Sequence, residues 1–334
     1  MRFVLAAFAI ALALAVAARA EQHPIVIKFS HVVAVDTPKG QAAEFFKRRA
    51  EELTSGRVRV EVYPNSTLYK DKEEIEALEL GAVQMLAPSL SKLGPLGAKE
   101  FEVFDLPFIF DDYADLRKVT EGPVGKRLLE TLESKGIHGL AYWDNGFKDF
   151  SANRPLRAVS DYRGLRVRVQ SSMVLEAQMR ALGALPQVMG FSEVYPALQA
   201  GIVDGAENPI SNLYTQRMHE VQKHESLTHH GYLGYAVIVN KKFWDRLPAS
   251  LRGKLEQAMQ ESTAYANRIA KEKNDEDLAK VQAAGKTQVY APTKEERLAL
   301  KKALVPVHAQ MEGRIGKDLI REIYQATEFH PDDL

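Results

Sequence analysis

The chain has 334 residues, 46% of them hydrophobic, and it contains no cysteine. Its 44 lysine and arginine residues balance its 44 aspartate and glutamate residues, and no basic stripe of the kind that binds DNA or RNA is present. A chain of this length favours two domains, each able to bury its own core without disulfide bonds.

The N-terminus has the pattern of a secretory signal peptide. Arg2 provides a positive start, residues 3–18 are uninterruptedly apolar, and Ala18 and Ala20 fit a signal peptidase site. The alternative is an uncleaved anchor, but the apolar run is shorter than the roughly 20 residues that a membrane-spanning helix needs. We therefore predict cleavage after Ala20 and an exported mature protein that does not itself span a membrane.

The first part of the mature chain alternates short strands and helices. Apolar or alternating runs predict strands at 25–30, 57–63 and 83–87. Apolar residues spaced three and four apart predict helices at 41–54 and 71–80. This order is typical of parallel strands joined by helices, so we expect an α/β sheet.

The middle of the chain repeats this pattern. We predict strands at 165–169 and 187–189 and helices at 172–182 and 192–200. A linking segment near 144–151 separates this second α/β unit from the first. Two such units predict two lobes with a cleft between them.

A long helix follows the second unit. Residues 249–284 contain no proline, with Ser250 as a candidate N-cap and Gly285 as a candidate stop. At 1.5 Å per residue such a helix is roughly 50 Å long, more than the diameter of one domain, so we expect it to lie across both lobes. The alternative is a pair of helices broken near 273–275.

The strand at 165–169 carries an arginine among apolar residues. Arg168 is flanked by Val167 and Val169, and its guanidinium group is costly to bury unless an anion meets it. The planar fork of donors matches a carboxylate in a bidentate way. The pattern therefore indicates a receptor for a small organic acid, and the alternative is an edge-strand arginine paired with a neighbouring acid.

Other polar residues fall where ligands bind in open parallel sheets, at the carboxyl ends of strands. His31, Thr37 and Lys39 lie in the first strand-to-helix connection, and Ser89 and Ser91 follow the third strand. Together with Arg168, the linking segment and the second unit add Lys148, Ser171, Phe191 and Asn208. Cations, hydroxyls and an amide facing one cleft would suit a ligand with two carboxylates.

Catalytic and metal-binding motifs are incomplete. Ser89 and Lys92 match S-x-x-K, but the K-T-G element of serine acyl-enzymes is missing. The sequence His224-Glu225 would need a histidine at the position of Thr228 to form a zinc-binding H-E-x-x-H helix. A glycine-rich dinucleotide fingerprint is also missing. We therefore predict no catalytic residue, no metal and no cofactor.

Seven segments resemble the extracytoplasmic solute receptors of tripartite ATP-independent periplasmic (TRAP) transporters, within their C4-dicarboxylate-binding branch. They include FSHVVAVDTPKG, GAVQMLAPSLSK, WDNGFKDFSANRPL, GLRVRVQSS and GFSEVYPALQAGIVDGAENP, and the similarity covers nearly the whole mature chain. The resemblance implies two α/β lobes joined by a hinge and spanned by a long helix. We expect lobe I at 21–146 with about 234–272, lobe II at 147–233 with about 273–320, and a tail at 321–334.

The same resemblance implies roles for four residues of the second lobe. Arg168 is expected to pair with the ligand carboxylate, and Ser171 and Asn208 to support that carboxylate. Phe191, which precedes S-E-V-Y, is expected to form a wall of the pocket.

Two positions separate this chain from the sialic-acid-binding relatives that it resembles. Lys148 stands where those relatives carry arginine, and Ser89 stands where they carry an acidic residue that serves a sugar group. Both differences favour a smaller acid. Lys39 and His31 complete the expected ligand-binding set.

The function implied by the resemblance is capture of a ligand in the periplasm. A closing cleft would hold a small carboxylate, with malate, succinate and fumarate as the leading candidates, and deliver it to the integral subunits of a membrane permease. One alternative is a sensory component that presents the same cleft to a signalling partner. The other is an exported hydrolase that uses Ser89 as its nucleophile.

Overall fold

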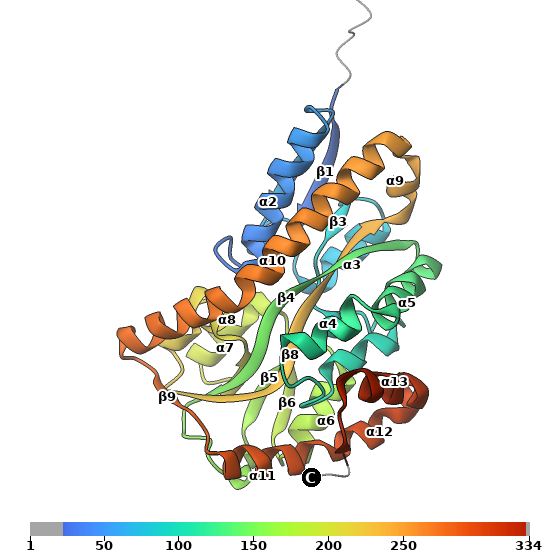
Figure 1. The fold of residues 1–334 in the computed structure, drawn as a ribbon. Helices are drawn as coiled ribbons and strands as arrows, with labels where there is room; N and C mark the ends of the chain where they lie inside the picture. Colours follow the sequence, from blue (N-terminus) through green and yellow to red (C-terminus); the bar gives the residue numbers. More distant parts are fainter. Residues whose placement is uncertain (1–22, 332–334) are drawn as a thin grey trace, which may run out of the picture.

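The structure is a computed structural model that describes residues 23–331, and within them all strands join one twisted sheet (Figure 1). The strand order is β2-β1-β3-β8-β4-β7-β5-β6, with β9 paired to β8. The strands are β1 (Ile25–Ser30), β2 (Val58–Tyr63), β3 (Met85–Leu86), β4 (Ile137–Ala152), β5 (Arg166–Val169), β6 (Leu185–Val188), β7 (Gly205–Asn208), β8 (His224–Asn240) and β9 (Gln288–Tyr290).

Two parallel units sit at the two ends of this sheet. In the first unit, β1 pairs in parallel with β2 and β3, and in the second unit β5 pairs in parallel with β6 and β7. The long strands β4 and β8 run antiparallel to each other and connect the units, because β8 pairs with β3 and β4 pairs with β7. The predicted α/β class is confirmed.

Helices pack against the sheet, and the helices of residues 294–327, in orange-red and dark red, lie together at one end of the molecule (Figure 1). The helices are α2 (Pro38–Leu53), α3 (Asp71–Glu79), α4 (Tyr113–Thr120), α5 (Pro123–Thr131), α6 (Met173–Ala181), α7 (Val194–Gln199), α8 (Ile210–Thr215), α9 (Lys241–Arg246), α10 (Ala249–Ala284), α11 (Lys294–Leu304), α12 (Pro306–Ile315) and α13 (Lys317–Thr327). None of the helices in residues 23–331 is long and apolar enough to cross a lipid bilayer.

Helix α10 is continuous over 36 residues, so the alternative of two helices broken near 273–275 is wrong. It packs against α2, β4 and α8, and therefore runs from the first unit to the second (Figure 1). Asn274 secures this crossing, because its side chain accepts from Ser211 N at 2.9 Å and donates to Asn145 O at 2.7 Å. Gly285, with φ 64°, ends the helix as predicted.

Several element boundaries differ from the sequence-based expectation. Helix α10 begins after Pro248 and is not capped by Ser250. Helix α2 begins at Pro38, because the side chain of Thr37 caps it by accepting from Gly40 N. The segment 144–151, expected to be a link, lies inside β4, where it pairs with both β8 and β7.

Each unit has its own apolar core. Trp143 and Phe46 pack against Phe29 in the first unit, with ring centroids 6.0 and 6.1 Å from that of Phe29. In the second unit, Phe150 and Tyr162 make an edge contact with centroids 5.0 Å apart. Burying each such aromatic ring contributes about 1.5–3 kcal/mol to the free energy of folding. The packed cores hold the strands of each unit in place, so the residues on both sides of the site have fixed positions.

The C-terminal end of the described chain is largely helical. Helix α13 packs against α4 and α5, so residues 321–327 of the segment that we expected to be a tail are helical. The predicted signal peptide, with its cleavage after Ala20, lies outside the described residues.

Candidate functional site

A narrow cavity lies where the two parallel units face each other. Residues from the first unit and β8 line one side, and residues that follow β5, β6 and β7 line the other. The lining residues are Val32, Val33, Lys39, Ser89, Lys92, Leu233 and Tyr235, and opposite them Gln170, Phe191, Asn208 and Asn212. The cavity volume is about 10 Å³, which holds no more than about one water molecule, so the cleft is closed in this structure.

Lys39 brings a buried ammonium group to the cavity. It lies in the first turn of α2 and is 1% exposed, and its Nζ donates to Ala87 O at 3.0 Å and lies 3.9 Å from the Tyr235 ring centroid. Burial, reinforced by the charge of Lys92, lowers the pKa of Lys39 to about 7. The helix dipole also disfavours a cation at this end, so a nearby anion would relieve the cost.

Lys92 and Asp71 form an ion pair at the cavity margin. Asp71 is the first residue of α3, and its second carboxylate oxygen accepts from the backbone N–H of Phe191 at 2.5 Å. Burial raises the pKa of the Asp71 carboxyl group, but the charge and hydrogen bond of Lys92, the hydrogen bond from Phe191 N and the charge of Arg168 together hold the pKa below its usual value. Because Phe191 belongs to the second unit, Asp71 connects the two sides of the cleft.

Arg168 lies beside the cavity on β5 and is 1% exposed. Its Nε and Nη2 donate to Met189 O at 3.2 and 3.0 Å, and its guanidinium carbon lies 5.7 Å from the ring centroid of Phe191. Burial lowers its pKa, whereas the charges of Asp71 and Glu207 oppose that change.

The sequence left open that Arg168 is an edge-strand arginine paired with a neighbouring acid. In the structure, such a pairing with an acid is found for Arg166 of the same strand and not for Arg168. Arg166 forms an ion pair with Asp204 at 2.7 Å, whereas no acid in the described part of the chain forms an ion pair with Arg168. Strand β5 is also not an edge strand, because it lies between β7 and β6. Arg168 is therefore a buried cation whose hydrogen bonds go only to a neutral carbonyl group.

Amide side chains complete the polar lining. Asn208 ends β7 and Asn212 lies on α8, and the Oδ1 atom of each is buried without a hydrogen-bond partner among the described residues. Opposite them, Gln170 Nε2 donates to Ser89 Oγ at 2.7 Å. Unsatisfied buried acceptors are costly, so these two carbonyl oxygens favour a donor such as a bound water molecule or a ligand hydroxyl group.

Four of the eight predicted ligand-binding residues line the cavity, namely Lys39, Ser89, Phe191 and Asn208, and Arg168 contacts Phe191 beside it. Lys148 lies outside the lining, because its Nζ pairs with Glu207 at 2.9 Å and lies 4.0 Å from Asp105. Ser171 also lies outside it.

His31 is fully buried near Lys39 and outside the cavity lining. Burial, reinforced by the Lys39 charge, lowers its pKa to about 3, so the imidazole is neutral, and neither ring nitrogen has a hydrogen-bond partner in residues 23–331. Sequence reasoning missed Lys92, Gln170, Asn212 and Tyr235 as lining residues. For Lys92 a signal existed, because it follows the predicted Ser89 and Ser91 in the same connection.

The alternatives based on catalytic and metal motifs find no support in the geometry. Lys92 pairs with Asp71 and the hydroxyl of Ser89 accepts from Gln170, so the S-x-x-K pair is not arranged as nucleophile and base. His224 and Glu225 lie on β8 and not on a helix. Within residues 23–331 no three His, Asp or Glu side chains are placed to share a metal ion.

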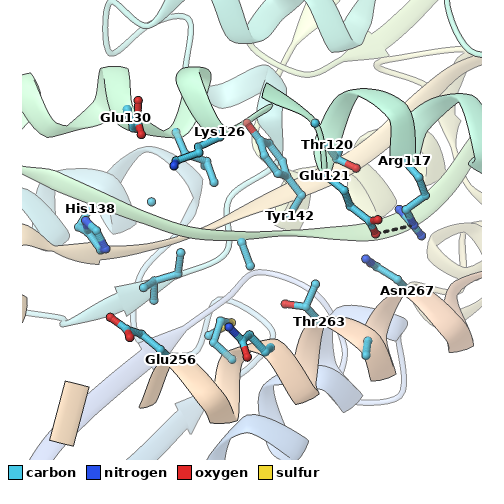
Figure 2. A pocket seen from close by; sticks show the side chains of 18 of the residues that line it. Arg117, Thr120, Glu121, Lys126, Glu130, His138, Tyr142, Glu256, Thr263 and Asn267 are labelled. Carbon is cyan, nitrogen blue, oxygen red and sulfur yellow. Dashed lines mark ion pairs between the residues drawn. The ribbon is translucent and has the colours of Figure 1, made fainter. Parts of the chain in front are cut away.

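A second, larger cavity of about 900 Å³ lies between α4–α5, β4 and α10 (Figure 2). None of the predicted site residues lines it. Among its lining residues Arg117 forms an ion pair with Glu121 at 3.4 Å, and His138 Nδ1 contacts the carboxylate of Glu133. It is an open groove on the first unit and lies apart from the cleft.

Solved structures define the class of protein. A TRAP periplasmic solute-binding protein from Sulfurospirillum deleyianum with bound succinate is 46% identical, with a TM-score of 0.88 over 90% of this chain and 99% of that one. A second, from Pseudomonas aeruginosa with bound L-malate, is 45% identical, with a TM-score of 0.84 over 86% of this chain and 100% of that one. The two units are therefore the lobes of a TRAP periplasmic solute-binding fold, which confirms the expected architecture.

The chain belongs to the bacterial extracellular solute-binding proteins of family 7, whose sequence profile matches residues 29–314. It is 63% identical over 321 residues to the C4-dicarboxylate-binding periplasmic protein DctP of Rhodobacter capsulatus, covering 96% of each chain. It is 41% identical over 305 residues to the C4-dicarboxylate-binding protein DctB of Bacillus subtilis, covering 91% of this chain and 87% of the relative. The family consists of extracytoplasmic solute-binding components of transport systems, not of enzymes.

Proposed function

We propose that this protein captures a C4-dicarboxylate, such as succinate, malate or fumarate, in the cavity between its lobes and delivers it to the membrane subunits of a TRAP permease. The observation that carries the proposal is the pair of buried cations on opposite sides of one cleft. Lys39 comes from the first lobe and Arg168 from the second, and neither forms an ion pair with an acid of the described residues.

Ligand carboxylates can take the place of the neutral acceptors that these cations now use. Lys39 donates to Ala87 O and Arg168 donates to Met189 O. A carboxylate adds the attraction of an opposite charge to the hydrogen bond, and Arg168 can form a bidentate pair with it. Two carboxylates on one short ligand would therefore be held from both lobes at once, with Asn208 beside them.

Capture requires the lobes to move. A cavity of about 10 Å³ cannot hold a four-carbon acid, so the lobes must separate before the ligand enters and close over it afterwards. Strands β4 and β8 are the connections on which this movement would take place, and Asp71 would restore its contact with Phe191 on closure. The predicted signal peptide, cut after Ala20, would place the mature protein in the periplasm beside the permease.

Thermal unfolding of the ligand-free mature protein in the presence of dicarboxylates tests the proposal. Ligand at about 100 times its dissociation constant adds about 2.7 kcal/mol of stability, which raises the midpoint by several degrees. We expect a rise with succinate, malate or fumarate that is lost in Arg168→Ala. Arg166→Ala is the matched control, because Arg166 lies on the same strand but pairs with Asp204. If no C4-dicarboxylate raises the midpoint, the proposal is wrong.

A further inference from the structure

One lining residue reaches from one lobe to the other with a neutral side chain. Gln170 follows β5, two residues after Arg168, and it is 8% exposed. Its Nε2 donates to Ser89 Oγ at 2.7 Å, and its Oε1 lies 3.4 Å from Ser91 Oγ. Since both serines belong to the first lobe, the Gln170 side chain spans the closed cleft at the cavity.

The wall that Gln170 reaches is itself held in place. Ser91 Oγ donates to Asp105 Oδ1 at 2.7 Å, and the next residue, Lys92, pairs with Asp71. Ser89 forms a β-bridge with Tyr235, so its backbone is tied to β8. Gln170 therefore meets a fixed surface, and the length of its side chain limits the space between the lobes at that point.

The chemistry of this wall differs from that of the rest of the cavity. Lys39 and Lys92 supply positive charge to the lining, whereas Gln170 and Ser89 form a neutral pair whose hydrogen bond already uses the amide N–H and the hydroxyl oxygen. A carboxylate placed there would displace that hydrogen bond, and the cation behind the wall, Lys148, already pairs with Glu207 at 2.9 Å and lies 4.0 Å from Asp105 Oδ1. A longer dicarboxylate, whose second carboxylate reaches further, is disfavoured on both counts.

We propose that Gln170, tied to Ser89, determines ligand length and restricts the site to four-carbon dicarboxylates. This inference rests on the proposed function, which it deepens. Truncating Gln170 removes the wall and leaves room for additional methylene groups. One methylene group changes discrimination by about 10–200-fold in a pocket that fits its ligand, so the preference for succinate over glutarate should fall by about tenfold or more.

Isothermal titration calorimetry of the mature protein with succinate, glutarate and adipate provides the test. In Gln170→Ala we expect the ratio of succinate affinity to glutarate affinity to fall by about tenfold or more. In Gln170→Met, which retains the length of the side chain, the wild-type preference should persist. Gln257→Ala, an exposed glutamine on α10, is the control for substitution itself. Unfolding midpoints of all variants establish that they are folded.

The possible results distinguish a failure of the proposed role of Gln170 from a failure of the proposed function. If the wild-type protein binds no dicarboxylate, the proposed function fails. If the wild-type protein binds succinate but Gln170→Ala retains the wild-type preference, only the role of Gln170 is overturned. A loss of preference in Gln170→Met as large as that in Gln170→Ala would also overturn it, because a steric wall depends on side-chain length.

Discussion

At the scale of single residues, the site is defined by cations that the protein buries without giving them a counter-ion. Arg168 and Lys39 are each 1% exposed and each donates to a backbone carbonyl group. Lys148 is buried to the same extent, but Glu207 neutralises it, so its charge is already used inside the protein. A buried cation is costly unless it is paired. Arg168 and Lys39 are therefore the charges that we expect to pair with a ligand, whereas Lys148 is already neutralised.

Substituting Arg168 by lysine tests whether the guanidinium fork matters in addition to its charge. Arg168→Lys retains the positive charge but removes the two parallel donors. We expect the affinity for the preferred dicarboxylate to fall by about 1.5–3 kcal/mol, or roughly ten- to a hundredfold, as measured by calorimetry. Arg166→Lys should leave the affinity close to wild type. An unchanged affinity in Arg168→Lys would mean that this side chain does not hold the ligand.

Lys39 predicts a pH dependence of binding. Its pKa of about 7 in the ligand-free protein should rise when a carboxylate lies beside it, so binding takes up protons above pH 7. The groups that face it are Lys92, Glu74, Asp71 and the neutral His31. The affinity should therefore fall by up to about tenfold per pH unit above pH 7.

Calorimetry at pH 8 in buffers of different ionisation enthalpy measures this proton uptake. We expect uptake of close to one proton in the wild-type protein and a clear reduction in Lys39→Met. Equal proton uptake in the two proteins would assign the effect to another group.

At the level of elements, strands β4 and β8 shift register at three points, and one of these lies where β4 begins to pair with β7 of the second lobe. Their register shifts between Lys148 and Phe150, and opposite this point His229 adopts φ 46°. The Asp149 side chain accepts from His229 N at 2.9 Å and so holds the irregular turn of β8. Such bulges bend and twist a strand, which is consistent with a hinge at this position.

Two carboxyl groups are buried together beside this irregularity. Burial raises the pKa of Asp149 to about 8 despite its backbone hydrogen bonds, and burial together with Asp149 raises the pKa of Glu225 well above its usual value. Groups with raised folded-state pKa values stabilise the protein in their protonated form at low pH. That contribution is lost as the pH rises from about 4 toward 8.

We therefore expect the free energy of unfolding to decline between pH 5 and pH 8, and Glu225→Gln to reduce the decline. The difference should be about 1 kcal/mol or more, since one pKa unit corresponds to about 1.4 kcal/mol. Urea denaturation at the two pH values measures it. Glu256→Gln, an exposed acid on α10, is the matched control. The same decline in Glu225→Gln and in the wild-type protein would contradict the assignment.

At the scale of the whole molecule, closure depends on contacts that join the lobes directly. Asp71 pairs with Lys92 on its own side and accepts from Phe191 N on the other, and Gln170 meets Ser89 in the same cleft. Helix α10 crosses both lobes and restrains how far they can separate. The Asp71–Phe191 and Gln170–Ser89 contacts form only when the lobes are together, so they favour the closed state.

Removing the Asp71 contact should shift the ligand-free protein toward an open state. In Asp71→Ala we expect a larger radius of gyration by small-angle X-ray scattering than in the wild-type protein. Glu76→Ala, an exposed acid on the same helix, should resemble the wild-type protein. If Asp71→Ala is as compact as the wild-type protein, then this contact does not hold the lobes closed.

Local periodicity along the chain predicted the alternating strands and helices, and the neighbours of Arg168 were enough to identify a cation in an apolar strand, whereas the continuity of α10 through 273–275 was settled by the structure. Only the tertiary structure decided that 144–151 continues as β4, because the pairing partners come from distant strands. It also decided that Glu207 neutralises Lys148, whereas Gln170 and Lys92 line the cavity. Burial and charge pairing depend on what packs across the cleft, and those partners are as much as 120 residues apart along the chain, as Asp71 and Phe191 are.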